Sequence, residues 1–395
     1  MASSCVTRNS DIAYQTDVLQ DVSRTFALTI PQLPDALRDV VGNAYLLCRI
    51  TDTIEDEPAL SGAQKERFWR RLVDAVAGRG DAAGFAEELG GSLSSSTTAS
   101  EHELVANTAR VVRITHGFRP AQRRVLERCV RIMSRGMAEF QQRDTSAGLD
   151  DMAQVDSYCY HVAGVVGETL TELFCDYSAV IERRRDELLA LAVSFGQGLQ
   201  MTNILKDIWE DRRRGACWLP RDIFLAAGFD LSSLCPGDNN PALADGLVAF
   251  VGSTRRHLED ALRFIEIVPR RETGIRRHCL WALGMAVLTL RRIHAKPTFS
   301  RGSEVKISRR SVSAVVVVTS ILARSNIALR LLFEALTRSL PSQGRGAGRR
   351  SGGTAHSEQP RTAGRGLSDM PDEAAAHDAA VPPASSRGAH DDYSP

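Results

Sequence analysis

Helical periodicity runs through almost all of the first 340 residues and constrains the fold more than any other feature of the chain. Apolar residues recur at spacings of three and four, as in residues 45–54, 125–137 and 188–199, which places them on one face of an α-helix. No run of alternating apolar and polar residues indicates a strand. Residues 311–340 include a valine run, but the arginines spaced along them favour one amphipathic helix. We therefore predict an all-α fold.

Breaks in this pattern divide the chain. Polar loops are expected at residues 90–96 and 236–241, where glycine, proline, serine and asparagine cluster. From Pro341 onward the composition shifts to glycine, arginine, serine, proline and alanine, and such a segment buries too little apolar surface to offset its ordering entropy. We predict one all-α domain over residues 10–340 and a disordered tail over residues 341–395.

Composition narrows the class of protein. The chain has 43% apolar and 25% charged residues and a formal net charge of +1, so its overall charge does not favour a nucleic-acid partner. The eight cysteines are scattered without a C-x-x-C pair, which favours buried free thiols over a zinc site or disulfides. No signal peptide is visible at the start, and residues 314–323 are about half the length that spans a bilayer. We expect a cytoplasmic protein without a transmembrane helix.

One acidic pattern occurs twice. The strings DTIED (residues 52–56) and DIWED (residues 207–211) each place carboxylates at i, i+3 and i+4, positions that share a helix face. Clustered carboxylates repel one another, and their hard oxygens suit Mg²⁺, with Mn²⁺ as the alternative ion. The predicted ligands are Asp52, Glu55, Asp56, Asp207, Glu210 and Asp211.

The surroundings of the two motifs favour a binding site. A single D-x-x-E-D string is common on exposed helices, but here an apolar run precedes each copy. Arg49 and Lys206 stand just before the motifs, where either cation can contact diphosphate. Two facing clusters of this kind would bind a metal–diphosphate and draw charge from the leaving group as it ionises.

Five blocks in order resemble the squalene and phytoene synthase family of head-to-head prenyl transferases. The blocks are SRTF (residues 23–26), the segment 45–56, YCYHVAGVVGE (residues 158–168), NILKDIWED (residues 203–211) and CWLP (residues 217–220). The resemblance covers about residues 15–340. It implies an isoprenoid synthase helical bundle whose central cavity takes the prenyl tails.

The resemblance also implies roles for individual residues. Asp52, Asp56, Asp207 and Asp211 would bind Mg²⁺ with diphosphate, and Tyr158 matches the tyrosine associated with ionisation and cyclopropanation. The positions that look like diphosphate contacts or face the same cavity are Ser23, Arg24, Arg49, Asn203 and Lys206. Ala216 stands where the family has another basic residue, and the neighbouring arginines at 212–214 are candidates to replace it.

Two features favour the reductive, squalene-forming branch of the family over the carotenoid branch. The first motif resembles the D-T-x-E-D form of squalene synthases, and residues 303–310 resemble their V-K-I-R-K segment, although Ser308 replaces an arginine. In that segment Lys306 and Arg309 would meet the 2′-phosphate of NADPH. A basic surface loop is the ordinary alternative for so short a string.

The predicted function is therefore squalene synthesis. Two farnesyl diphosphates would condense head to head to presqualene diphosphate, which NADPH would reduce to squalene. The near alternatives are presqualene diphosphate, dehydrosqualene or phytoene synthesis without NADPH, and the distant one is a non-catalytic helical assembly factor. Chain-elongating prenyl transfer would require D-D-x-x-D on both helices. The apolar face and arginines of residues 311–340 also suit peripheral membrane contact, with core packing as the alternative.

Small residues in VAGVVG (residues 162–167) leave two alternatives open. Glycine inside a helix costs about 0.5–1 kcal/mol relative to alanine, so Gly164 and Gly167 each need a reason. Close packing of two helices and close approach of an isoprenoid chain both supply one.

Overall fold

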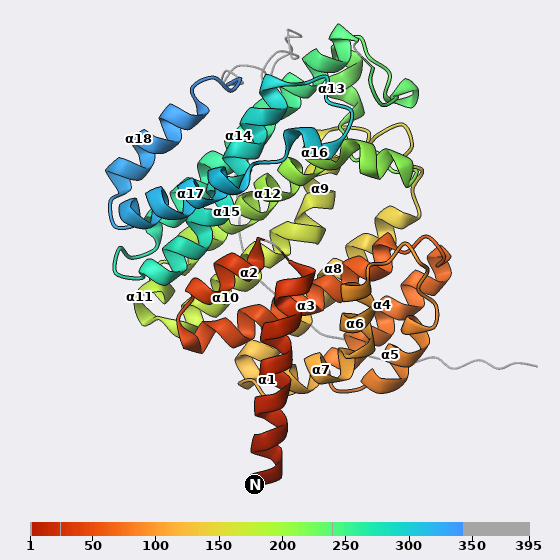
Figure 1. The fold of residues 1–395 in the computed structure, drawn as a ribbon, viewed down its shortest axis with the longest axis vertical. Helices are drawn as coiled ribbons and strands as arrows, with labels where there is room; N and C mark the ends of the chain where they lie inside the picture. The colour runs from red at the N-terminus through yellow and green to blue at the C-terminus, as the bar shows by residue number, and fades with distance from the viewer. Residues whose placement is uncertain (1, 24, 239, 343–395) are drawn as a thin grey trace, which may run out of the picture. The chain divides into compact units, whose positions relative to one another are not determined.

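The computed structural model of the chain describes residues 2–23, 25–238 and 240–342, all of which lie in one compact unit (Figure 1). These residues form helices and turns, and their only β-structure is a single bridge between Leu149 and Pro220. The predicted all-α fold is confirmed. The predicted tail falls almost wholly on residues 343–395, outside the described residues.

The helices follow one another along the whole described chain, with η1 and η3 as 3₁₀ turns and η2 as a π-helix. Their bounds are α1 (Ala2–Val22), α2 (Phe26–Thr29), η1 (Ile30–Gln32), α3 (Asp35–Asp56), α4 (Gly62–Val76), α5 (Ala82–Gly90), α6 (Ala99–Ala106), α7 (Thr108–His116), α8 (Pro120–Gln141), α9 (Met152–Cys159), η2 (Tyr160–Gly164), α10 (Val165–Tyr177), α11 (Ala179–Glu182), α12 (Arg185–Arg213), α13 (Arg221–Ala226), η3 (Leu231–Ser233), α14 (Pro241–Ile267), α15 (Thr273–Ala295), α16 (Gly302–Val305), α17 (Arg309–Leu322) and α18 (Asn326–Thr337).

Local sequence signals explain several helix starts. Ser61 and Thr98 open α4 and α6 with capping boxes, in which each hydroxyl accepts from a backbone amide three residues later. Pro241 occupies the first turn of α14, where its missing N–H costs nothing, and the Asn240 side chain caps that helix. These signals fix where helices begin, and their apolar faces decide how the helices pack.

Helix α12 is the central element and packs against α10, α14, α15 and η2. Among the described residues it is also the one helix long and apolar enough to cross a membrane, by length and composition alone. Half of its most apolar window (50%) is buried inside the protein, as expected for a core helix. The absence of a transmembrane helix therefore stays a prediction.

Close backbone contact explains Gly167 in the 162–167 segment and Gly196 on the helix packed against it. A Cβ atom on Gly167 would lie 2.1 Å from the carbonyl oxygen of Ala192, and one on Gly196 would lie 2.2 Å from that of Ala163. Neither backbone oxygen can move without separating the helices, so packing of α10 and η2 on α12 requires glycine here. Gly167 and Gly196 also line an apolar cavity, so packing and cavity shape depend on the same residues.

Residues 311–340 do not form one helix, contrary to the prediction. They form α17 and α18, separated at residues 323–325. The fully buried Arg276 draws the chain inward there, because its guanidinium donates to the carbonyl of Ala323 (2.5 Å) and to the side chain of Asn326 (2.7 Å). Ser325 then caps α18 by accepting from the amide of Ala328 (3.3 Å).

The seven cysteines whose side chains the structure describes are free thiols, as predicted, and of these seven all are buried except Cys235, which is exposed.

Candidate active site

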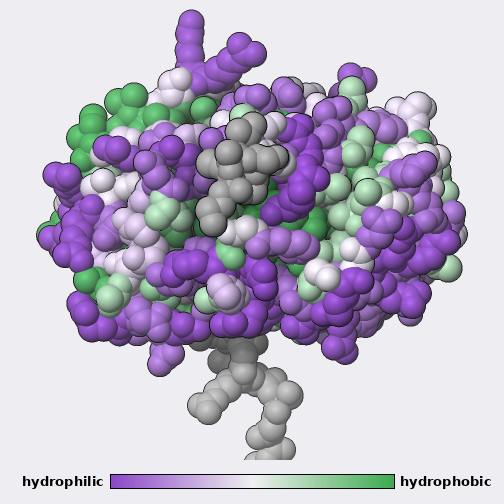
Figure 2. Space-filling model, turned by 90° about the horizontal axis from the view of Figure 1, so that it is seen from below, coloured by the Kyte–Doolittle hydropathy of each residue, from purple (hydrophilic) through white to green (hydrophobic). Residues whose placement is uncertain are grey.

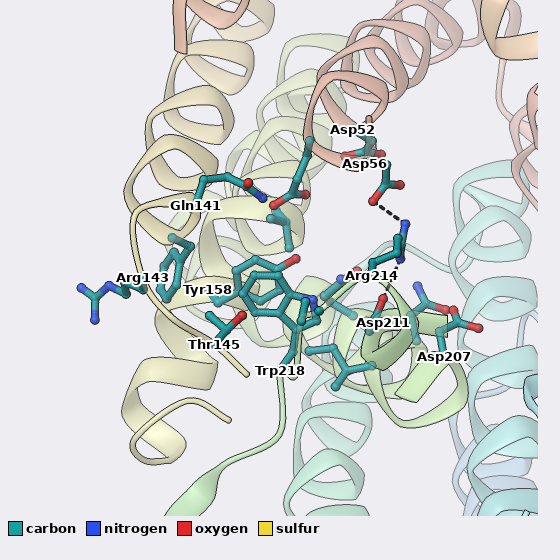
Figure 3. Close-up of a pocket in the computed structure, with 18 of the residues that line it drawn as sticks. Asp52, Asp56, Gln141, Arg143, Thr145, Tyr158, Asp207, Asp211, Arg214 and Trp218 are labelled. Atoms are coloured by element: carbon teal, nitrogen blue, oxygen red, sulfur yellow. Dashed lines mark hydrogen bonds and ion pairs between the residues drawn. The ribbon is translucent and has the colours of Figure 1, made fainter. Parts of the chain in front are cut away.

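The two acidic motifs lie at the C-terminal ends of α3 and α12 and face one cavity (Figure 3). This cavity has a volume of about 810 Å³. Its acidic wall consists of Asp52, Glu55, Asp56, Asp207 and Asp211. Carboxylates separated by about 150 positions in sequence are thus brought together, as the repeated motif predicted.

Glu210 lies apart from this group. Helix α12 is interrupted at Asp207, whose backbone (φ −102°, ψ 15°) departs from helical geometry. Glu210 is not among the described residues that line the cavity; it pairs with Arg213 (3.1 Å) and lies against Gly302 of α16. The first motif therefore presents all three carboxylates to the cavity, and the second presents only its two aspartates.

Burial in this acidic wall perturbs the carboxylates strongly. Burial, together with the charge of Asp56, raises the pKa of Asp52 to about 7 despite the nearby Arg49. Burial likewise raises the pKa of Asp211 to about 6, and that of Glu55 well above its usual range. Burial thus shifts these carboxyl groups toward the protonated form, and a bound cation would oppose that shift.

The acidic wall suits a cation that brings ligands of its own. Within the described residues, no three carboxylate, histidine or cysteine side chains converge closely enough to hold a metal ion by themselves. The Oε1 atom of Glu55 is buried and has no hydrogen-bond partner in the described part of the chain. Mg²⁺ fits this donor set, because it retains water and shares phosphate oxygens rather than requiring a closed protein cage.

Among the cations that line the cavity, Arg214 and Lys65 contact the first acidic motif. Arg214 donates to Asp56 and to Asp211, each at 2.6 Å, and so joins the two motifs (Figure 3). Lys65 reaches in from α4 and donates to the carbonyl of Glu55 (2.5 Å), and burial lowers its pKa. The arginine run at 212–214 signalled the first of these cations. No sequence signal pointed to Lys65, which tertiary packing brings there.

Of the predicted diphosphate contacts, Arg49, Asn203 and Lys206 line the cavity. Arg49 pairs with Glu101, and its Nε atom is buried and has no partner in the described residues. Lys206 pairs with Asp207 at 3.1 Å. These three side chains therefore lie where a diphosphate would meet the acidic wall.

Of the other two predicted contacts, one lies outside the cavity lining and one outside the described residues. Ser23 is buried, and its hydroxyl accepts from the amide of Phe26 (2.9 Å) at the start of α2, outside the cavity lining as described. Arg24 lies outside the described residues.

Tyr158 stands on α9 immediately before the π-helix η2, a helix type often found at functional sites. Its ring is buried and stacks on Trp218 with centroids 4.0 Å apart and an interplanar angle of 4°. Phe140 meets Tyr158 edge-on at 5.3 Å. Burial, reinforced by Glu55, raises the pKa of Tyr158, so its phenol stays protonated. Trp218, from the CWLP block, is a further cavity residue that the sequence analysis did not single out.

A second, apolar cavity of about 300 Å³ adjoins the acidic one. The two share lining residues, among them Arg49, Asp52 and Asn203. Its large apolar walls are Phe26, Tyr45, Met133, Phe174, Phe195 and Phe264. An apolar chain in this cavity would have its polar end at the acidic wall.

The predicted nicotinamide contacts lie outside both cavities. Lys306 and Arg309 are exposed and follow α16, whose Gly302 packs against the carbonyl of Lys206. No ion pair involves either side chain within the described residues. The segment thus runs beside the second acidic motif without contributing to the cavity wall.

Comparison with known proteins agrees with this geometry. The sequence profile of squalene/phytoene synthase matches residues 19–311. The chain is 29% identical over 300 residues to Botryococcus squalene synthase of Botryococcus braunii, covering 75% of this chain and 60% of that protein. It is 29% identical over 312 residues to squalene synthase 1 of Arabidopsis thaliana, covering 76% and 69%. The chain therefore spans less than two thirds of the first of these relatives.

Solved structures confirm the isoprenoid synthase bundle. TcSQS in complex with the ligand BPH1237 has a TM-score of 0.66 and 24% identity, covering 86% of this chain and 94% of that one. A dehydrosqualene synthase in complex with a ligand has a TM-score of 0.60 and 18% identity, covering 80% and 98%.

Proposed function

The chain belongs to the squalene/phytoene synthase family, and on that premise we propose that it is a prenyltransferase that joins two molecules of farnesyl diphosphate head to head. One observation carries the proposal: an acidic cavity built from two carboxylate motifs opens onto an apolar cavity with aromatic walls. A substrate with a charged head and a long apolar tail fits across that boundary.

In the proposed reaction Asp52, Asp56, Asp207 and Asp211 would hold Mg²⁺, which neutralises the charge that gathers on the departing diphosphate. Arg49 and Lys206 would hold the diphosphate oxygens by charge-assisted hydrogen bonds. The apolar walls would hold the prenyl tail and exclude water, so that the allylic cation meets a double bond before it meets a water molecule.

The first half of the reaction forms a cyclopropane. One farnesyl diphosphate loses diphosphate, the double bond of the second attacks the resulting allylic cation, and loss of a proton closes the ring to presqualene diphosphate. The stacked rings of Tyr158 and Trp218 would stabilise positive charge through their π-faces. The protonated Tyr158 phenol would orient the diphosphate or the proton that leaves.

The second half of the proposed reaction is the reductive step. Presqualene diphosphate would ionise, rearrange and be reduced to squalene, for which NADPH supplies hydride. Lys306 and Arg309 would hold its 2′-phosphate, since both are exposed cations without an ion pair in the described chain. In the alternative the product is presqualene diphosphate, dehydrosqualene or phytoene, and NADPH has no effect.

Product analysis tests both halves. Purified protein is incubated with farnesyl diphosphate and Mg²⁺, with and without NADPH, and products are resolved by mass spectrometry. Squalene that appears only with NADPH would support the full proposal. A cyclopropyl diphosphate or dehydrosqualene regardless of NADPH would remove the reductive half. No turnover of farnesyl or geranylgeranyl diphosphate would favour a non-catalytic assembly role.

We further propose that α17 and α18 rest on anionic membrane, into which a product such as squalene would partition. Ile321 and Ile327 are 74% and 71% exposed on these helices. Arg310 at the start of α17 and Arg324 between the two helices are exposed and have no ion pair within the described residues. Figure 2 shows that hydrophobic residues reach the surface at the left of the molecule among mostly hydrophilic ones. Exposed apolar side chains flanked by arginines suit a charged bilayer surface.

Flotation with phosphatidylserine-containing liposomes tests whether α17 and α18 bind an anionic membrane. The double variant Ile321→Ser/Ile327→Ser should stay in solution while the native chain floats. Leu225→Ser, at an exposed apolar site on α13, is the matched control and should float like the native chain. Equal flotation of all three proteins, or none, would contradict the proposal.

A further inference from the structure

Three consecutive arginines, Arg212 to Arg214, stand where α12 ends, and they have different partners. Arg212 donates to backbone carbonyls of the loop that includes Leu234, and Arg213 pairs on its own helix. Arg214 extends between the two acidic motifs and donates to Asp56 and Asp211. Among the described residues it is the one cation that bridges them by ion pairs.

The helix end fixes this placement. Gly215 has a positive φ of 81°, its amide donates to the carbonyl of Arg212 (3.1 Å), and the amide of Ala216 donates to that of Asp211 (3.0 Å). This pair of bonds is a Schellman motif, in which glycine supplies the left-handed residue after the helix. These two hydrogen bonds fix the backbone after the helix. The side chain of Ala216 carries no charge, whereas that of Arg214 supplies a positive charge between the two acidic motifs.

The partners of Arg214 are also proposed metal ligands. A divalent ion at the acidic wall would compete with Arg214 for these two carboxylates, because two cations held close to one carboxylate repel each other. The side chain of Arg214 is 47% exposed, so it has room to turn away. Its planar fork then matches the oxygens of a diphosphate.

Three other cavity cations have different attachments. Arg49 is held by Glu101, Lys206 by the adjacent Asp207, and Lys65 by the backbone carbonyl of Glu55. None of these joins one motif to the other in the described structure. A divalent ion that enters the site would therefore displace Arg214 before the other three cations.

We propose that Arg214 is an exchangeable counter-ion of the site, an inference that rests on the proposed function. In the metal-free protein it holds α3 and α12 together through Asp56 and Asp211. When divalent ions take those carboxylates, Arg214 transfers to the diphosphate of the substrate. Arg214 thereby supplies the positive charge that alanine at position 216 does not, from two positions earlier in the chain.

The variant Arg214→Gln separates these two roles because they respond in opposite directions. Without diphosphate, the variant should bind Mn²⁺ about three- to tenfold more tightly, since no guanidinium competes for the carboxylates. With saturating Mn²⁺, it should bind inorganic diphosphate about tenfold more weakly. Mn²⁺ binding is followed by electron paramagnetic resonance, and diphosphate binding by calorimetry.

Arg143→Gln is the matched control. Arg143 lines the same cavity but pairs with Glu139 and contacts neither motif, so its loss changes the cavity charge equally. Both affinities should change much less than in Arg214→Gln. A second variant, Arg214→Lys, keeps the charge but loses the fork, and its diphosphate affinity should fall between those of the native chain and Arg214→Gln.

The outcomes distinguish this inference from the proposed function. If the native chain binds Mn²⁺ and diphosphate but Arg214→Gln behaves like Arg143→Gln, the counter-ion role is wrong and the proposed function stands. Weaker Mn²⁺ binding by Arg214→Gln also overturns it. If the native chain binds neither Mn²⁺ nor diphosphate, both the inference and the metal-dependent reaction fail.

Discussion

Magnesium binding should release protons from the acidic wall, with a strong dependence on pH. Asp52 has a pKa of about 7 and Asp211 of about 6 in the metal-free protein, because burial disfavours their charged forms. Mg²⁺ requires both as carboxylates, so ion and proton compete. Affinity for Mg²⁺ should therefore rise as the pH rises through 6 and 7.

The size of the effect follows from the two pKa values. At pH 6.5, Asp52 is about three quarters protonated and Asp211 about one quarter, so together they release about one proton. At pH 8 the same sum falls to about a tenth of a proton. Any proton on Glu55, whose pKa is also raised, adds to the release.

The raised pKa values also affect folding. Between about pH 4 and 7 these carboxyl groups hold more protons in the folded, metal-free chain than in the unfolded chain, so the free energy of unfolding falls as the pH rises through that window.

Calorimetry in buffers of different ionisation enthalpy measures the released protons directly. In Asp52→Asn the release at pH 6.5 should fall to about a quarter of a proton from Asp211 plus any from Glu55. Asp35→Asn is the control, because its side chain is 91% exposed at the far end of α3, and it should leave the release unchanged. A native release below about 0.3 proton at pH 6.5, or an equal release at pH 6.5 and 8, would refute the reasoning.

Three further predictions concern packing and the aromatic pair. Gly167→Ala should lower the free energy of unfolding in urea by about 1–2 kcal/mol, because overpacking outweighs the gain in helix propensity, whereas Gly90→Ala, with no atom near its added Cβ, should not lower it. Trp218→Leu should reduce the rate of product formation about two- to tenfold, through loss of the ring stacked on Tyr158, and leave Mn²⁺ affinity unchanged. Arg276→Leu should lower the free energy of unfolding by about 3 kcal/mol or more, since it strands buried carbonyl groups, and equal urea midpoints for variant and native chain would contradict this.

Local patterns predicted the fold class and much of the cavity. Apolar periodicity, capping residues and the repeated acidic string act over a few residues, and each is visible in one sequence. They predict a common site for Asp52, Asp56, Asp207 and Asp211, and in the structure these four residues line one cavity. The structure confirms the helical bundle, and the metal-binding role of these aspartates stays a prediction.

What the sequence missed depends on contacts between distant segments. Arg276 breaks the predicted 311–340 helix from 47 residues away, and an arginine inside a helix carries no mark of that role. The interruption of α12 at Asp207, with α16 packed beside it, leaves Glu210 off the cavity wall although its spacing predicted one shared face. Helical spacing predicts a face only while the helix stays regular.

The acidic cavity is arranged in a way that costs stability when no ligand is present. Glu55 keeps a buried oxygen without a partner in the described chain, and Asp52 has a pKa near neutrality. Arg214 offsets part of this cost at Asp56 and Asp211. Since Asp52 also borders the apolar cavity, a carboxylate whose charge is disfavoured by burial lies where a charged head would meet an apolar tail. In the proposed reaction, the bond that breaks lies at that boundary, so ligand binding would relieve the strain of the site at the place where charge develops.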